Sequence, residues 1–175
     1  AAVLIQESGS VPEQNKEKQR SALKWITQEA EKHHLPYQIV GGLAAIAHGG
    51  SRPLNDIDLY MPFGDPHWPD FLTAVTNYVV WGPESVVEGA WDLTYVKISY
   101  LGQKIEIGDS ENLKIQDCET GRWVDQVIDF HTSVSGTILG CRIAVMPVDQ
   151  LITYKRLLGR DVDKHDVRQL TFTQQ

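Results

Sequence analysis

The stretch that most constrains this chain is residues 55–61, which read Asn-Asp-Ile-Asp-Leu-Tyr-Met. Successive side chains of a β-strand point to opposite faces, so a strand here carries Asp56, Asp58 and Tyr60 on one face and apolar residues on the other. The apolar face predicts contact with a hydrophobic core, which leaves two carboxylates side by side on the open face. Neighbouring carboxylates repel each other and are tolerated when a cation or a proton is present. Hard oxygen ligands of this kind are typical of Mg²⁺ sites, where carboxylates act together with substrate phosphates.

Periodicity elsewhere predicts that this strand belongs to a sheet flanked by helices. We expect helices over residues 10–34, 43–48, 70–80, 147–158 and 161–170, and strands over 37–40, 55–61, 93–100, 104–108 and 138–146. The strands within 93–108 form a hairpin with its turn at 101–104. Mixed strands and helices are typical of an α/β or α+β protein. We therefore predict an α/β (α+β) fold in a single domain over residues 1–175, with 1–10 as a flexible N-terminus and no structure predicted for 109–137.

The charge and composition of the chain exclude several classes of protein. The net charge is −7, whereas a general nucleic-acid binder is expected to present a basic face. The two cysteines, Cys118 and Cys141, lie in no zinc-ligand pattern, which argues against a disulfide scaffold and against a structural zinc site. No stretch approaches the ~18 apolar residues of a membrane span, so we expect no membrane partner. Two free thiols fit a reducing compartment, and we expect a cytoplasmic protein.

The segment before the aspartate strand has features that suit a phosphate. Gly41-Gly42 stands between a predicted strand and a predicted helix, where the unpaired N–H groups of a helix N-terminus face an anion. Glycine also lets a phosphate approach the backbone closely, although a tight turn is the alternative explanation for the pair. Arg52 lies four residues before Asp56 and is either a partner for phosphate oxygens or an ordinary surface arginine. The segment therefore offers both phosphate donors and magnesium ligands, as a nucleoside triphosphate with Mg²⁺ requires.

Residues 41–59, with Gly-Gly, a short helix, Arg and then Asp-Ile-Asp, resemble the signature of the DNA polymerase β-like nucleotidyltransferase superfamily. Within it, the chain is most similar to small bacterial enzymes of the aminoglycoside and lincosamide nucleotidyltransferase type. The order of elements over residues 36–170 follows the family, and specific matches lie at both ends of that range. Those of the C-terminal end resemble a Leu…Lys…Arg…Asp-x-x-Asp pattern of relatives and are Pro147, Leu151, Lys155, Arg160, Asp163 and Asp166.

The resemblance implies nucleotidyl transfer, in which an acceptor hydroxyl attacks the α-phosphorus of a nucleoside triphosphate and pyrophosphate leaves. Two Mg²⁺ ions would bridge three carboxylates and the triphosphate. Asp56 and Asp58 match the first two carboxylates of the family. Glu106 is our candidate for the third, since it stands between two isoleucines and so points away from the core, with Asp109 and Asp92 as alternatives. A glutamate here departs from the aspartate of many relatives.

The resemblance also extends to the nucleotide. In relatives, a lysine at the position of Lys155 can reach the nucleotide, whereas an exposed helical lysine is the alternative. The predicted nucleotide-binding residues are therefore Gly41, Gly42, Arg52 and Lys155. Asp163 and Asp166 share one face of the last helix. We expect this pair to form ion pairs rather than to bind metal, with partners among Arg160, Lys164 and Arg168.

These observations predict a Mg²⁺-dependent nucleotidyltransferase that uses a nucleoside triphosphate such as ATP and modifies a hydroxyl-bearing acceptor. A cationic small molecule such as an antibiotic suits the acidic chain better than RNA, which like charge would repel. We expect the acceptor pocket to draw on residues 62–92 and 109–137. Three alternatives stay open. One is a catalytically silent module of the antitoxin kind that binds a nucleotide or a partner, and another is a toxin-type enzyme that modifies a protein or tRNA. The third is a globular domain in which these motifs are coincidental.

Overall fold

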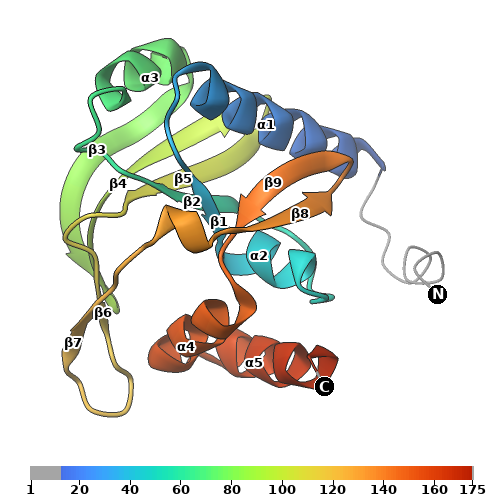
Figure 1. Ribbon diagram of the computed structural model, residues 1–175, viewed down its shortest axis with the longest axis vertical. Coiled ribbons are helices and arrows are strands. Elements are labelled where there is room, and N and C mark those ends of the chain that lie inside the picture. The colour runs from blue at the N-terminus through green and yellow to red at the C-terminus, as the bar shows by residue number, and fades with distance from the viewer. Residues whose placement is uncertain (1–12, 175) are drawn as a thin grey trace.

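The computed structural model describes residues 13–174, and the predicted flexible segment at 1–10 lies outside them. A mixed sheet forms the centre of the molecule (Figure 1). Its strands are β1 (Gln38–Val40), β2 (Ile57–Met61), β3 (Val79–Glu88), β4 (Trp91–Tyr100), β5 (Gln103–Asp109), β6 (Lys114–Gln116), β7 (Trp123–Asp125), β8 (Val134–Ile138) and β9 (Cys141–Val145). They run in the order β7-β6-β4-β5-β2-β1-β9-β8, and β3 pairs with β4 outside this path. The pairs β2–β5 and β1–β9 are parallel, and the other pairs are antiparallel.

Helices flank this sheet on both sides. They are α1 (Glu13–Lys32), α2 (Gly41–Ala47), α3 (Trp68–Val75), α4 (Val148–Leu158) and α5 (Asp161–Thr173). Figure 1 shows α1 and α3 on one side of the sheet and the α4–α5 hairpin on the other. None of these helices is both long and apolar enough to cross a membrane. The mixed sheet with flanking helices confirms the predicted α/β (α+β) class.

The aspartate strand β2 is held in place by one almost completely buried face. Ile57, Leu59 and Met61 are at most 1 % exposed and belong to the hydrophobic core that the buried face of α1 also enters. Full burial of such a side chain contributes about 1.5–3 kcal/mol. A shift of β2 by one residue would turn Asp58 into this core and lose that contribution, so the apolar face fixes the register of the strand.

The region that follows β2 differs from the prediction. Its spacing predicts a helix over residues 70–80, but α3 ends at Val75 and β3 begins at Val79. β3 pairs with β4 along its length and continues through Gly82-Pro83, with register shifts on either side of Trp81. Gly82 has a φ of 79°, which glycine tolerates and which lets the strand bend without ending. Pairing with β4 and the β-branched valines of this segment outweigh the helical spacing.

Two tight hairpins complete the sheet. The predicted strand over residues 138–146 is instead the turn and second strand of the β8–β9 hairpin, whose turn residues are Leu139 and Gly140. The predicted hairpin of β4 and β5 is confirmed, with Leu101 and Gly102 in its turn. All four turn residues have positive φ, as the favoured two-residue hairpin turn requires. Residues 109–137, for which the sequence predicts no structure, contain the short strands β6 and β7.

Candidate active site

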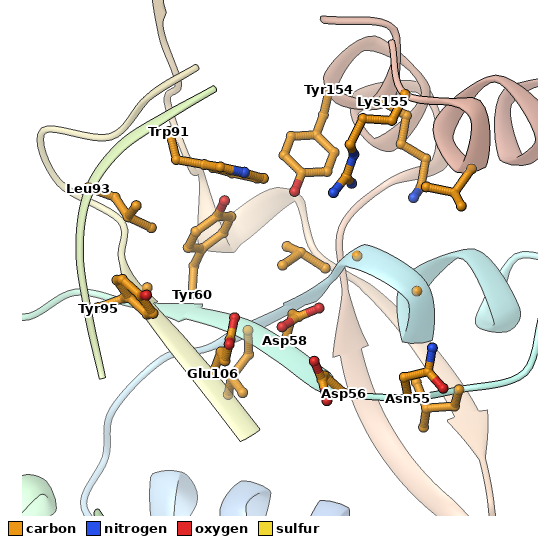
Figure 2. Close-up of a pocket in the computed structure, with 18 of the residues that line it drawn as sticks. Asn55, Asp56, Asp58, Tyr60, Trp91, Leu93, Tyr95, Glu106, Tyr154 and Lys155 are labelled. Carbon is orange, nitrogen blue, oxygen red and sulfur yellow. The ribbon is translucent and has the colours of Figure 1, made fainter. Parts of the chain in front are cut away.

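Strand pairing brings the predicted carboxylates together. β2 and β5 are parallel, and their register places Asp58 directly beside Glu106. Asp56 lies two residues before Asp58, immediately ahead of the first residue of β2. Figure 2 shows the three carboxylates gathered at one end of a cavity that all three residues line. The sheet thus collects carboxylates from two separate parts of the sequence in one place.

The alternative candidates for the third carboxylate lie elsewhere. Asp109, at the end of β5, accepts hydrogen bonds from the backbone N–H groups of Phe63 and Glu111, each at 3.1 Å. It therefore stabilises the loops at that end of the sheet. Asp92 lies on β4 and pairs in register with Lys114 of β6. Neither Asp109 nor Asp92 lines the cavity that holds Asp58.

The cavity has a volume of about 520 Å³. This lies within the range of about 300–1,000 Å³ that is usual for small-molecule sites. One wall carries cationic side chains from the loop before β2 and from the α4–α5 hairpin. The other carries aromatic and acidic side chains from β3 and β4, together with Lys97 of β4, which pairs in register with Glu106. All of the predicted site residues line this cavity, namely Gly41, Gly42, Arg52, Asp56, Asp58, Glu106 and Lys155.

The carboxylates lie in an environment that is short of positive charge. Burial raises the pKa of Asp58 to about 7, and repulsion from Glu106 and Asp56 adds to the increase. Lys155 and Arg160 lower this pKa without cancelling those effects. The pKa of Glu106 is raised as well, first by burial and then by Asp56. Either protonation of Asp58 or a bound cation would relieve the same repulsion.

The donor chemistry at these carboxylates suits Mg²⁺, because every donor is a hard oxygen. As the side chains lie, however, no group of three Asp, Glu, His or Cys residues within 13–174 is arranged to hold a metal ion. Mg²⁺ draws its ligands to about 2.0–2.1 Å, and mutual repulsion opposes such an approach by carboxylates that lack a cation. The raised pKa of Asp58 indicates the charge deficit that a cation would remove. A metal site at Asp56, Asp58 and Glu106 therefore stays a prediction that this environment fits.

Gly41 and Gly42 differ in their relation to Asp58. Gly41 has a φ of 63°, and a Cβ atom there would stand 2.7 Å from Oδ2 of Asp58. A Cβ atom on Gly42 would meet nothing within 4 Å. The backbone turn and the approach of Asp58 therefore both require glycine at 41, whereas Gly42 leaves open backbone at the cavity. The start of α2 has no side-chain cap, so its first N–H groups are left for water or a ligand.

Arg52 is held by α5 and is not a free surface arginine. Its Nε and Nη2 atoms donate to Oδ1 and Oδ2 of Asp166 at 2.7 and 2.6 Å. Lys155 is 2 % exposed, and its Nζ atom lies 2.8 Å from Oδ2 of the same aspartate. The alternative of an exposed helical lysine is therefore wrong for Lys155. Both predicted nucleotide-binding cations line the cavity and meet on one buried carboxylate behind its wall.

The ion pairs of α5 are only partly those predicted from the sequence. Asp163 pairs with Arg160, whose Nε atom donates to Oδ2 of Asp163 at 2.6 Å. Asp166 does not pair with its own helix but with cations from other elements, because it is buried against them while Lys164 and Arg168 are exposed. Arg160 also lines the cavity, so it is a third cation of this wall, although the sequence predicts it only as part of the C-terminal pattern and as an ion-pair partner of the α5 aspartates.

The opposite wall was only partly anticipated. Trp91, Leu93 and Tyr95 of β4 line it together with Glu88 at the end of β3, and Figure 2 shows Leu93 and Tyr95 to one side of the carboxylates. Trp91 packs against Tyr154 of α4 with ring centroids 5.5 Å apart. The alternation of apolar side chains along β4 is the sequence signal that could have identified this wall.

The predicted source of the acceptor pocket needs correction. Of residues 62–92, only Glu88 and Trp91 line the cavity, and residues 109–137 contribute nothing to it. Part of that second segment forms β6 and β7, which continue the sheet from β4 to its far edge. Trp68 and Trp81, which also lie within residues 62–92, do not line the cavity. Trp68 stacks on Phe63 with ring centroids 3.8 Å apart, and Trp81 packs against Tyr95.

Solved structures identify the fold as that of nucleotidyltransferases. TM1012 from Thermotoga maritima, itself only provisionally assigned as a nucleotidyltransferase, matches with a TM-score of 0.63 and 16 % identity over 89 % of this chain and 92 % of its own. ANT(2")-Ia, solved in complex with adenylyl-2"-tobramycin, matches with a TM-score of 0.55 and 16 % identity over 90 % of both chains. LnuA, a lincosamide antibiotic adenylyltransferase with lincomycin bound, matches with a TM-score of 0.55 and 12 % identity over 85 % of this chain and 94 % of its own. Among known protein families and curated proteins, none matches the chain.

These similarities confirm the fold that the resemblance of residues 41–59 implies. The matched structures cover nearly the whole of this chain and of their own chains, so the shared fold is not confined to the aspartate motif. At 12–16 % identity the likeness concerns the fold. The residues of the cavity determine which chemistry this fold supports.

Proposed function

We propose that this protein is a Mg²⁺-dependent nucleotidyltransferase that moves a nucleoside monophosphate from a nucleoside triphosphate to a hydroxyl group of an acceptor. The observation that carries the proposal is the strand register that sets Asp58 beside Glu106 in a cavity whose wall holds Arg52 and Lys155. A triphosphate with its metal needs anionic ligands for the cation and cationic donors for the phosphates. The cavity offers both within one small volume, and the fold shared with two adenylyltransferases supports the assignment.

In this proposal, the triphosphate lies between the carboxylates and the cationic wall. Arg52, Lys155 and the N–H groups at the start of α2 bind and orient its phosphate oxygens. Asp56, Asp58 and Glu106 would hold Mg²⁺, which supplies charge stabilisation to the attacking and leaving oxygens when it is bound.

The transfer itself is an in-line displacement. The acceptor oxygen forms a bond to the α-phosphorus while the bond from that phosphorus to the bridging oxygen of the β-phosphate breaks, so pyrophosphate leaves. Glu106 accepts the proton that the acceptor hydroxyl releases. It suits this role by position, because it lines the cavity beside Asp58.

We propose a small molecule as the acceptor. Trp91, Leu93 and Tyr95 offer an apolar face of limited size, and Glu88 adds a carboxylate that would attract a cationic group. The antibiotic-modifying relatives were solved with lincomycin and with adenylyl-2"-tobramycin, which agrees with a small acceptor. We place the reaction in the cytoplasm, where nucleoside triphosphates are available and where the free thiols of Cys118 and Cys141 would stay reduced.

A thermal-shift titration with Mg²⁺ and each of the four common nucleoside triphosphates tests the site. At about 100 times its Kd, the preferred triphosphate should stabilise the protein by about 2.7 kcal/mol, or by about 5–10 °C in Tm. The Asp56→Asn/Asp58→Asn double variant should show no shift. Asp92→Asn, which removes a carboxylate outside the cavity, should shift like the wild type.

Pyrophosphate release with a panel of hydroxyl-bearing acceptors then separates the enzyme from its alternatives. The proposal expects release with at least one small-molecule acceptor, and it is contradicted if no triphosphate shifts the Tm of the wild type. A thermal shift without pyrophosphate release from any acceptor would instead support the silent nucleotide-binding module. Release only with tRNA or a protein would support the toxin-type enzyme.

A further inference from the structure

The cations of the cavity wall share a feature that the proposed reaction does not explain. Arg52 comes from the loop before β2, Lys155 from α4 and Arg160 from the connection to α5, yet all of them are anchored on two aspartates of α5. These aspartates, Asp163 and Asp166, are 0 % and 2 % exposed and do not line the cavity themselves. The cationic wall is therefore assembled by side chains that no substrate in the cavity would touch.

We infer that Asp166 is a positioning residue, which directs Arg52 and Lys155 toward the triphosphate without touching it. The inference rests on the proposed function and goes beyond it, because it assigns a role to a buried residue that does not line the cavity. Asp166 is the one acidic side chain shared by both of the predicted nucleotide-binding cations in the described structure.

The geometry of the pair with Arg52 fixes the direction of its guanidinium. Asp166 binds the edge formed by Nε and Nη2, while Nη1 makes no hydrogen bond to any residue from 13 to 174. The Arg52 side chain is 32 % exposed, so the remaining edge is accessible. A guanidinium held along one edge presents its other donors in a fixed plane, which suits phosphate oxygens.

Asp166 also holds Lys155. The Nζ atom of Lys155 lies 2.8 Å from Asp166 and 3.7 Å from Asp163, and the lysine is almost fully buried. Burial alone would raise the pKa of Asp166, but the hydrogen bonds from Arg52 and Lys155 outweigh burial and lower it. Asp166 therefore stays ionised and fixes Nζ of Lys155 beside the cavity.

A purely stabilising role explains this network less well. A buried ion pair adds little net stability compared with apolar side chains of similar volume. Here three cations share two carboxylates, so the network keeps an excess of positive charge at the cavity wall. That excess faces the carboxylates of Asp56, Asp58 and Glu106 across the space that the triphosphate would fill.

Binding of Mg²⁺–tripolyphosphate, measured by isothermal titration calorimetry, tests the inference on the wild type, Asp166→Asn and Asp161→Asn. Asp161 is exposed on the same helix, so its replacement removes the same charge without disturbing the network. Coulomb attraction alone predicts that both changes tighten the binding of an anion. If Asp166 positions the cations, Asp166→Asn should instead weaken the binding of Mg²⁺–tripolyphosphate by about tenfold. Asp161→Asn should bind as tightly as the wild type or more tightly.

Kinetic constants and conservative variants distinguish positioning by Asp166 from a purely structural role. Asp166→Asn should raise KM for the nucleoside triphosphate by about the same factor and change kcat less, since the lost interaction concerns binding. Asp166→Glu keeps the carboxylate and should recover affinity to within about threefold of the wild type. If circular dichroism shows that Asp166→Asn does not fold, Arg52→Lys decides instead. Lysine keeps the positive charge but cannot make the two parallel hydrogen bonds that Arg52 makes to Asp166. If positioning matters, Mg²⁺–tripolyphosphate should bind more weakly, and if only the charge matters, its affinity should not change.

The outcomes separate this inference from the proposed function. If the wild type binds Mg²⁺–tripolyphosphate and Asp166→Asn, or Arg52→Lys in its place, binds it equally or more tightly, positioning by Asp166 is overturned and the proposed function stands. If the wild type binds nucleoside triphosphates but not tripolyphosphate, the cations do not hold the phosphate chain. The inference about Asp166 is then overturned, and the proposed function stands. If the wild type binds neither tripolyphosphate nor any nucleoside triphosphate, both the inference and the proposed function are overturned.

Discussion

Replacing Asp58 with asparagine is expected to make the protein more stable and at the same time inactive. Burial disfavours the ionised form of this side chain, and repulsion from the neighbouring Glu106 and Asp56 adds to the effect. Removing that charge relieves the repulsion in the folded state. The same change removes a proposed ligand of the metal, whose charge stabilisation of the transition state amounts to several kcal/mol. We therefore expect transfer to slow by about a thousandfold or more.

The gain in stability depends on pH in a direction that follows from the pKa. The ordinary pKa of Asp58 is 3.8, and its pKa in the folded protein is about 7. Between these values the unfolded chain has released a proton that the folded protein still holds, so the free energy of unfolding falls as pH rises through this window. Asparagine cannot ionise, and Asp58→Asn therefore gains little at low pH and most above the folded pKa. With allowance for screening by water, the gain above that pKa is on the order of 2 kcal/mol, or about 4–8 °C in Tm.

Thermal unfolding in EDTA at about pH 5 and at about pH 8 measures this dependence on pH. Asp92→Asn is the matched control, since it removes an aspartate of the neighbouring strand β4 that does not line the cavity. We expect it to change neither the pH dependence of Tm nor the transfer rate. A gain in Tm by Asp58→Asn that is equal at both pH values would contradict the assigned pKa, and retention of transfer would contradict the proposed role.

Gly41→Ala is expected to damage both the fold and the site, whereas Gly42→Ala is expected to spare the fold. An alanine at 41 would have to adopt a φ of 63° and place its Cβ atom 2.7 Å from Oδ2 of Asp58. Strain in this backbone region and displacement of Asp58 together should cost about 2 kcal/mol, or about 4–8 °C in Tm. Transfer should fall as well, because Asp58 cannot keep its place beside Glu106.

Gly42→Ala, at the next residue, is the control for Gly41→Ala. A Cβ atom at Gly42 meets nothing within 4 Å, so Gly42→Ala should leave Tm unchanged or raise it slightly through the smaller entropy of the unfolded chain. If phosphates pack on this backbone as proposed, Gly42→Ala should still raise KM for the nucleoside triphosphate. Equal Tm values for the two variants would refute the close contact between Gly41 and Asp58.

The carboxylate part of the site could be predicted from local sequence because its residues lie on strands with a clear alternation. Ile105 and Ile107 are fully buried, and this places Glu106 between them on the opposite face of β5. The same alternation orients Asp58 on β2. What local sequence could not supply is that β5 pairs with β2 in parallel and in the register that makes these two residues neighbours. The family resemblance implies a third carboxylate, and the alternation favours Glu106 over Asp109 and Asp92 for it.

The cationic part depends on contacts between distant residues and so carried little local signal. Arg52 and Asp166 are 114 positions apart, and neither position reveals that a loop arginine will meet a buried aspartate of the last helix. The helix predicted over residues 70–80 fails for a related reason. Its spacing is compatible with a helix, but pairing with β4 is available only in the folded sheet and favours the strand β3.

Anchoring of the cations on α5 has a consequence for the order in which the site is made. A ribosome adds about 5–20 residues per second from the N-terminus, and the residues of α4 and α5 follow every strand of the sheet. A nascent chain that has just released β5 therefore holds Asp56, Asp58 and Glu106 but neither Lys155 nor Asp166. The carboxylates of the site therefore precede the anchors of its cationic wall in the order of synthesis. A chain that stops before α5 would keep the proposed metal ligands but would lack the aspartates that hold Arg52 and Lys155.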